Sequence, residues 1–204
     1  MKFKIVAIVQ TFNECGSGNL ERFFTYLKPA VDDIVVYDDG STDGTYEFVQ
    51  QQTPHVIRAI RNDFQNEVAH KDALLKMAQT LRPDFILWLD CDEILTDEGR
   101  EGLNALCQEC VNKQADGVSL HEINLWRSNS WARLDSLYND GWFIRLWYNS
   151  PSLRFITIPA GLHKTNYPWS IKKIIKSDLM SVIHYGFSSE NRILYKYLNY
   201  RRHG

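Results

Sequence analysis

The feature that most constrains the fold is an apolar run that ends on acidic residues. Positions 85–89 are five consecutive apolar residues, preceded by Arg82-Pro83-Asp84 and followed by Asp-Cys-Asp-Glu at positions 90–93. A run of this type predicts a strand that is buried on both faces of a sheet. Three carboxylates within four residues then concentrate negative charge at one edge, where like charges raise one another's pKa.

Two interpretations of this acidic cluster are open. A hard divalent cation takes oxygen ligands, and Mg²⁺ or Mn²⁺ often bridges a protein carboxylate and a diphosphate. Alternatively, the cluster is a solvated acidic turn that caps the following helix. The order of the surrounding elements favours the metal.

Strand and helix patterns alternate through the first half of the chain. Strands are predicted at 2–9, 33–37, 56–60 and 85–89, and helices at 19–27, 46–52 and 67–81. Thr42 or Asp43 is placed to cap the second helix. This alternation is typical of an α/β fold with a central, mostly parallel sheet that is flanked by helices and joined by right-handed crossovers.

Polar loops follow three of these strands, at 10–14, 38–45 and 90–93. The carboxyl ends of parallel strands meet at one edge of the sheet, which is where open α/β sheets bind ligands. Neither a G-x-G-x-x-G motif after the first strand nor a P-loop is present, which argues against a Rossmann dehydrogenase or a kinase-like NTPase. Phosphates would therefore have to be held by a metal, for which the acidic cluster offers a place.

The second half has a different pattern. A helix is predicted at 96–112, begun by Thr96, and a terminal helix at 188–202, capped by Ser188 or Ser189. Strands are predicted at 117–126, 142–148, 153–158 and 179–184, with a turn at 149–152 that makes the second and third of them a hairpin. Residues 127–140 show no clear period and are interpreted as a loop.

The 204 residues suffice for one domain with a sizeable core. We find no secretory signal and no apolar run long enough to span a membrane. Cys107 and Cys110 share the face of a predicted helix, and no second pair completes a zinc site, so reduced thiols and a cytoplasmic location are expected. The terminal helix ends at residues 200–204 without a clear stop signal, as would a domain within a longer polypeptide.

Two compositional features of the second half leave alternatives open. Residues 164–204 hold eight Lys or Arg against two Asp or Glu. Such a segment suits phosphates, an anionic acceptor or peripheral contact with anionic lipid, and equally a solvated helix face, which is more common. Five of the six tryptophans follow residue 125; aromatic rings pack on sugars, but a core or loop-anchoring role is more common.

The loop sequences resemble the family 2 glycosyltransferases, which have a GT-A fold and use nucleotide-diphosphate sugars. The matching pieces are TFNE at 11–14, VVYDDGSTDGT at 35–45 and LDCDE at 89–93, the last being a D-x-D motif. GWFIRLW at 141–147, GLH at 161–163 and HYGF at 184–187 are similar to a bacterial subgroup that acts on lipopolysaccharide core. The resemblance implies one GT-A domain over 1–204, with a nucleotide-sugar half at 1–95 and an acceptor half at 96–204.

The resemblance also implies roles for individual residues in donor binding. Asp39 would accept a hydrogen bond from uracil or another base, as a charged acceptor reads an imide N–H well. Asp90 would hold the ribose or the sugar, and Asp92 the metal that bridges both phosphates. The remaining donor-binding candidates are Gln10, Thr11 and Glu14 around the base and ribose, Cys91 within the acidic motif, and Arg61, His70 and Lys71 near the phosphates.

His163 is a candidate second metal ligand. For the general base of an inverting transfer we prefer Asp140, in the loop before Trp142, with Glu122 and Asp135 as alternatives. Two departures from the subgroup matter: His163 is followed by Lys164 rather than Glu, and His70-Lys71 replaces Arg-Asn.

The sequence therefore predicts an inverting glycosyltransferase that depends on Mn²⁺ or Mg²⁺ and moves a sugar, with UDP as the expected carrier, to a glycan or lipid-linked acceptor. No nucleic-acid partner is expected. The alternatives are a sugar nucleotidyltransferase, whose glycine-rich basic signature is missing from the first strand, and a non-catalytic module that binds nucleotide sugars or glycans.

Overall fold

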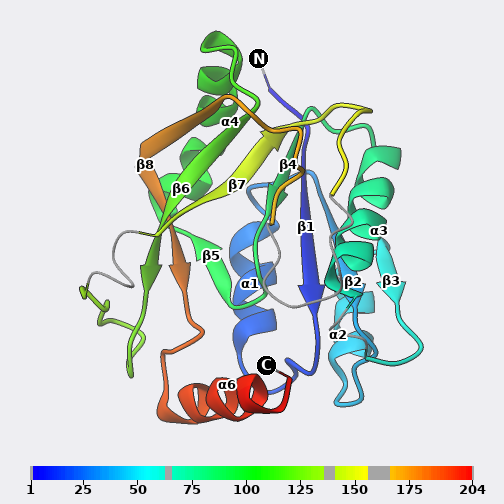
Figure 1. The fold of residues 1–204 in the computed structure, drawn as a ribbon, viewed down its shortest axis with the longest axis vertical. Helices are drawn as coiled ribbons and strands as arrows, with labels where there is room; N and C mark the ends of the chain where they lie inside the picture. Colours follow the sequence, from blue (N-terminus) through cyan, green and yellow to red (C-terminus); the bar gives the residue numbers. More distant parts are fainter. Residues whose placement is uncertain (1, 63–65, 136–140, 156–165, 204) are drawn as a thin grey trace.

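A computed structural model describes residues 2–62, 66–135, 141–155 and 166–203 of the chain (Figure 1). In chain order the elements are β1 (Ile5–Thr11), α1 (Asn19–Leu27), β2 (Asp33–Asp38), α2 (Thr45–Gln52), β3 (Val56–Arg58), α3 (Glu67–Thr80), β4 (Phe85–Trp88), β5 (Glu93–Leu95), α4 (Asp97–Asn112), β6 (Gly117–Asn124), β7 (Trp142–Tyr148), β8 (Ile174–His184) and α6 (Glu190–His203).

A single sheet organises these elements, with the strand order β3-β2-β1-β4-β7-β6-β8-β5. The first four strands of that order are mutually parallel. β7 is antiparallel to both of its neighbours, β6 and β8 are parallel to each other, and β5 runs antiparallel to β8 at the edge. All strands except β7 and β5 therefore share one direction, which confirms the mostly parallel sheet within the described residues.

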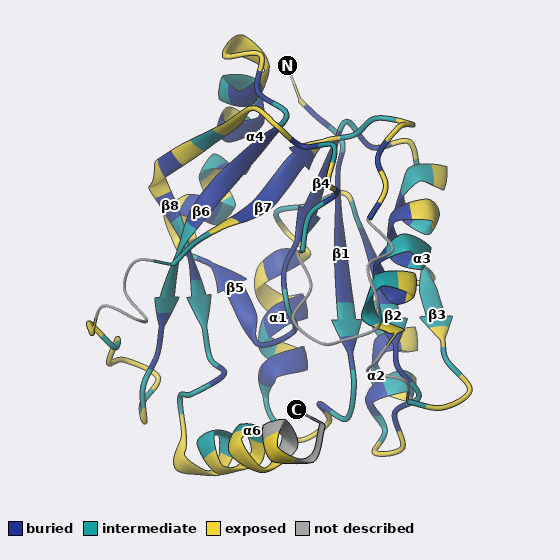
Figure 2. Cartoon of the chain, viewed as in Figure 1, coloured by how far each residue is buried: buried dark blue, intermediate teal, exposed yellow. Residues whose placement is uncertain are grey.

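Helices cover both faces of the sheet because alternate residues of β1 point to opposite sides. Ile5, Ala7 and Val9 pack in one core with side chains from α1 and α4. Val6 and Ile8 pack in a second core against α3. Figure 2 shows the central strands β1 and β4 largely buried, whereas parts of β8 and the outer surfaces of the helices are exposed. The result is a three-layer α/β fold in which the strand ends are free to carry polar loops.

Most predicted elements are confirmed, with shifts of a few residues at their ends. Thr96 caps α4, since its hydroxyl accepts a hydrogen bond from the amide of Gly99, and Ser189 Oγ accepts one from the amide of Arg192 in α6. The N-cap of α2 is Gly44 in the left-handed region rather than Thr42 or Asp43. Asp43 Oδ1 still accepts a hydrogen bond from the first amide of α2.

Three expectations about strands are corrected by the structure. Residues 153–155 form no strand, so the predicted hairpin after β7 is wrong in its described part; residues 156–158 lie outside the described residues. β8 begins at Ile174 rather than at 179. β5 was not predicted: the chain turns after β4, where the Glu93 amide donates to the Asp90 carbonyl at 2.9 Å, and crosses to the other end of the sheet to pair with β8.

The cysteines follow the more common of their two interpretations, whereas the tryptophans after residue 125 differ in burial. Cys107 and Cys110 are buried and unpaired, and burial raises the pKa of the Cys110 thiol to about 11. Trp147 is fully buried, whereas Trp131 and Trp169 are 73% and 51% exposed. Within the described residues, none of the helices is long and apolar enough to cross a membrane.

Candidate functional site

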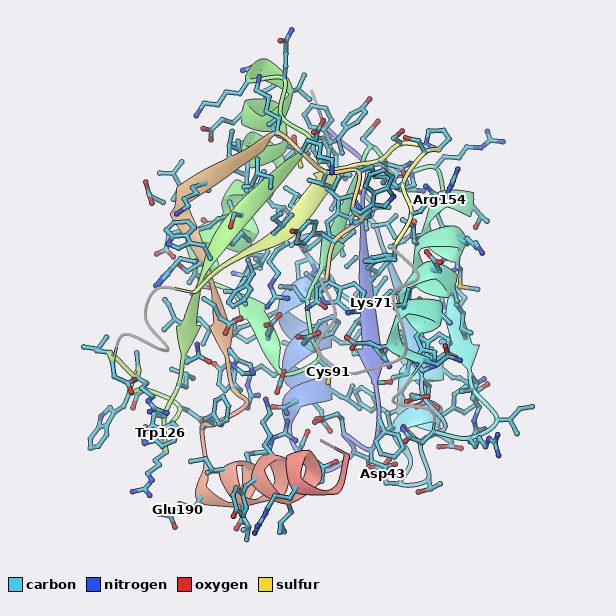
Figure 3. All side chains as sticks on the ribbon, in the orientation of Figure 1. Asp43, Lys71, Cys91, Trp126, Arg154 and Glu190 are labelled. Carbon is cyan, nitrogen blue, oxygen red and sulfur yellow. The ribbon has the colours of Figure 1, made fainter. Side chains whose placement is uncertain are left out.

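The polar loops after β1 and β4 meet at one edge of the sheet, as the parallel arrangement requires. They enclose a pocket of about 250 Å³ whose other wall is α6. Figure 1 shows α6 lying across the carboxyl ends of these strands, and Figure 3 places Cys91 above that helix. The lining residues are Gln10, Thr11, Phe12, Glu14, Asp90, Cys91, Asp92, Arg192, Tyr195 and Lys196.

A larger cavity, of about 530 Å³, lies at the opposite end of the sheet. It is lined by residues at the start of β1, the loop after α1 and the side of α4. Its charged groups are ordinary surface residues such as Lys2 and Asp32, which pair with each other at 3.1 Å. Because ligands of open α/β sheets bind at the carboxyl ends of the strands, the smaller pocket is the candidate site.

Asp39 lies beside this pocket, after the end of β2, and is fully buried. Its Oδ2 accepts a hydrogen bond from the Asn62 amide at 2.7 Å, and its Oδ1 lies 3.8 Å from His70 Nε2. His70 in turn contacts Gln10 at 3.0 Å and stacks on the Tyr37 ring. The predicted base-binding residues Asp39 and Gln10 are thus linked through one histidine.

The turn after Asp39 depends on Gly40. Its φ is +72°, a region that favours glycine, and a Cβ there would lie 2.6 Å from the backbone of Arg61. Arg61 itself is exposed. The exposed side chain of Arg61 is therefore not held in the pocket, so its predicted phosphate contact stays a prediction. The backbone of Arg61 packs closely against the turn that follows Asp39.

Asp92 is the most strongly paired carboxylate in the pocket. Its Oδ2 lies 3.1 Å from Lys196 Nζ, 3.3 Å from Arg192 Nη2 and 3.4 Å from His184 Nε2. Although burial opposes it, these basic neighbours hold the pKa of Asp92 well below its usual value. Burial, together with the charges of the pocket carboxylates, raises the pKa of the neighbouring Cys91 thiol, which therefore stays protonated.

Glu14, like Asp92, pairs with a basic side chain of α6. Arg192 donates to both Glu14 oxygens, at 3.2–3.3 Å, and Asn19 donates a further hydrogen bond at 3.0 Å. The pocket therefore joins the loop after β1, the acidic loop after β4 and the terminal helix through one set of ion pairs.

A second charged network lies next to the pocket, around the fully buried Arg145 of β7. Its guanidinium donates to Glu93 and, at 2.9 Å, to Glu122, and lies 4.0 Å from Asp90. Burial together with the charges of Asp90 and Glu122 raises the pKa of Glu93 despite the ion pair with Arg145. His184 connects the two networks, since its ring lies 3.8 Å from Glu122 and 3.4 Å from Asp92.

The metal expectation can be compared with this donor set. Asp90 and Asp92 both line the pocket, and carboxylate oxygens are the ligands that Mn²⁺ and Mg²⁺ accept. No group of three or more His, Cys, Asp or Glu suited to a metal occurs in the part of the chain that the structure describes. A cation at Asp92 would have to share or displace its pairs with Arg192 and Lys196.

Other predicted residues are placed outside the pocket. Lys71 is fully buried and lies 2.5 Å from Glu67, and burial lowers its pKa. Glu122 is held by Arg145 and Asn124, and Asp135 pairs with Arg133 on the surface. Asp140 and His163 lie outside the described residues.

Sequence reasoning missed Arg192, Lys196 and Arg145, and it included His184 only as part of the matching piece at 184–187. Arg192 and Lys196 stand four residues apart in a predicted helix, on one face, within the basic segment already noted. Arg145 is a charged residue inside an otherwise apolar strand pattern, which indicates a buried ion pair.

A comparison with known protein families shows which family this chain belongs to. The model of the family described as glycosyl transferase family 2 matches residues 6–152. The chain belongs to glycosyl transferase family 2. The expectation of a GT-A fold, drawn from the resemblance to this family, agrees with the mixed α/β sheet flanked by helices.

Solved structures provide further comparisons for this family 2 member. The crystal structure of S. aureus TarS is 20% identical, with 65% of this chain and 23% of that chain covered and a TM-score of 0.46. S. aureus TarS 1–349 in complex with UDP-GlcNAc is 22% identical, with 65% and 37% covered and a TM-score of 0.46. This chain thus spans well under half the length of these structures. A comparison with curated proteins gave no matching relative.

Proposed function

We propose that this family 2 member transfers a sugar from a nucleotide-diphosphate sugar, with UDP as the carrier, to a hydroxyl of a glycan or lipid-linked acceptor. The observation that carries the proposal is the pocket at the carboxyl edge of the sheet, where Glu14, Asp90 and Asp92 converge beside Asp39. In this proposal Asp39 binds the base, Gln10, Thr11 and Glu14 line the base and ribose site, and Asp90 holds the ribose or the sugar.

The proposed transfer inverts the configuration of the sugar carbon. A carboxylate general base takes the proton of the acceptor hydroxyl as the hydroxyl oxygen bonds to the sugar carbon, and the bond from that carbon to the diphosphate breaks. Asp140 is our first assignment for this base and Glu122 the alternative. Mn²⁺ or Mg²⁺, when bound through Asp92, supplies Lewis-acid neutralisation of the leaving diphosphate. The lipopolysaccharide-core type of acceptor, the cytoplasmic location and peripheral membrane contact through the basic C-terminal segment remain predictions from the sequence.

A thermal-shift panel tests donor binding. Ligands that bind only the folded state stabilise it, by about 2.7 kcal/mol at 100 times their dissociation constant. UDP-sugars are expected to raise the melting temperature, and the shift should increase when Mn²⁺ is added. Uridine-free sugars serve as the control. If no nucleoside diphosphate or nucleotide sugar shifts the melting temperature, with or without Mn²⁺, the proposal is wrong.

A pair of variants tests the base. Asp140→Asn is expected to reduce turnover by about 10²-fold or more, because the amide cannot accept the acceptor's proton, while donor affinity stays unchanged. Glu122→Gln is the matched comparison, measured by the same transfer assay and donor titration. Full activity in Asp140→Asn discards that assignment, and a selective loss in Glu122→Gln transfers the role to Glu122.

A further inference from the structure

Two basic side chains of α6 project into the pocket, although α6 lies far outside the residues that the family model matches. We infer that Arg192 and Lys196 bind the diphosphate of the donor, an inference that rests on the proposed function. Upon donor binding, their present contacts with Glu14 and Asp92 would be exchanged in part for phosphate oxygens.

The geometry gives both cations access to one ligand. They stand four residues apart on the same face of a helix, and both reach Asp92 Oδ2, at 3.3 Å and 3.1 Å. Gly186 leaves room for this arrangement, since a Cβ at that position would lie 2.1 Å from Lys196 Nζ and 2.3 Å from His184 Nε2. The cations are therefore held at the carboxylate beside which the diphosphate is proposed to lie.

Arg192 keeps hydrogen-bonding capacity for a ligand. Its contacts with Glu14 and Asp92 measure 3.2–3.3 Å, longer than the roughly 2.7–2.9 Å typical of strong charge-assisted bonds. Its Nε is buried and has no hydrogen-bond partner among the described residues. A guanidinium presents five N–H donors in a planar fork that matches phosphate oxygens, so this side chain can take a phosphate without losing every present contact.

The charge balance of the pocket requires such cations. Glu14, Asp90 and Asp92 all line it, and three carboxylates alone would repel a diphosphate. Arg192 and Lys196 are the basic residues among the described lining residues, and they offset two of these three negative charges. The opposite possibility is that α6 blocks the donor, in which case removing its cations would improve binding.

Titration of matched variants separates these possibilities. The probe is the tightest binder among UDP, GDP, CDP and dTDP, together with its monophosphate and its parent nucleoside, measured by calorimetry in EDTA and again with Mn²⁺. Arg192→Gln and Lys196→Gln are each expected to weaken diphosphate binding about tenfold, and the double variant about 100-fold. Nucleoside binding should not change, and the monophosphate should lose less than the diphosphate.

Two controls keep the experiment interpretable. Arg201→Gln removes an arginine of the same helix that bonds to Tyr197 instead of the pocket, and it should leave every affinity unchanged. Arg192→Lys keeps the charge but not the planar fork, so it should restore part of the affinity that Arg192→Gln loses, even where both variants melt at a lower temperature.

The outcomes are distinct. If the wild-type chain binds a diphosphate and both glutamine variants bind it equally well or more tightly, the inference is wrong and the proposed function stands. An equal loss of nucleoside and diphosphate binding would likewise overturn the inference, since it would reflect a structural role for α6. If none of the four diphosphates binds the wild-type chain, the proposed function falls and the inference falls with it.

Discussion

Arg145→Met is expected to lower the free energy of unfolding by about 3–5 kcal/mol, because it leaves buried carboxylates without their cation. Glu93 and Glu122 both pair with this guanidinium, and the side chains of Arg145 and Glu93 are only 3% and 2% exposed. Denaturant unfolding followed by circular dichroism measures the change. Arg100→Met is the matched control: Arg100 pairs with the largely exposed Asp97, and such a surface pair contributes about 1 kcal/mol or less.

The pH dependence of the stability loss in Arg145→Met provides a sharper test than the magnitude of that loss. The pKa of Glu93 is already raised in the folded chain, and removing Arg145 should raise it further. The folded state then binds more protons than the unfolded state, so stability falls as the pH rises from the ordinary glutamate pKa through the raised one. The deficit relative to wild type should be smallest in acid. A deficit that is equal at every pH would contradict the network described here.

Asp92→Asn is expected to reduce sugar transfer on the order of 10²–10³-fold, since the amide keeps the shape but loses the charge that organises the proposed diphosphate site. Donor titration and kcat/KM with the best donor of the thermal-shift panel measure the effect. Asp178→Asn, which changes an exposed carboxylate of β8, is the control. Unchanged transfer by Asp92→Asn would remove Asp92 from the site.

The ion pairs of Asp92 also lead us to expect a loss of stability in acid. Its pKa is lowered by Lys196, His184 and Arg192, so its ion pairs stabilise the fold above the ordinary aspartate pKa. That contribution is lost as the pH falls through the lowered pKa. Asp92→Asn should therefore be less stable than wild type near neutrality and approach it in strong acid.

The first half of the fold could be predicted because its signals are local. β1, β2 and β4 each contain an apolar run bounded by turn residues, and the parallel rule alone brings their loops together. β5 could not be predicted in the same way, since Glu93–Leu95 is only three residues long and its strand character comes from pairing with β8. Residues 153–155 show the reverse case, in which a strand-like pattern has no strand partner among the described residues.

The candidate site was predicted only where its residues belong to the strand-end loops. Asp39, Asp90 and Asp92 follow β2 and β4, so topology places them at the edge of the sheet that carries the pocket. Arg192 and Lys196 reach the same pocket from α6, and no sequence period shows where a terminal helix will dock. The helical pattern around Lys71 is right, but the pattern does not show that its side chain lies buried and paired with Glu67.

The ion pair between Arg192 and Glu14 joins residues 178 positions apart, which has a consequence for the order of folding. Contacts this distant in sequence close late, because the intervening chain must first be ordered. During synthesis from the N-terminus, the sheet from β1 to β4 can be assembled long before α6 exists. Until α6 docks, the carboxylates of the pocket are therefore hydrated and lack the cations Arg192 and Lys196.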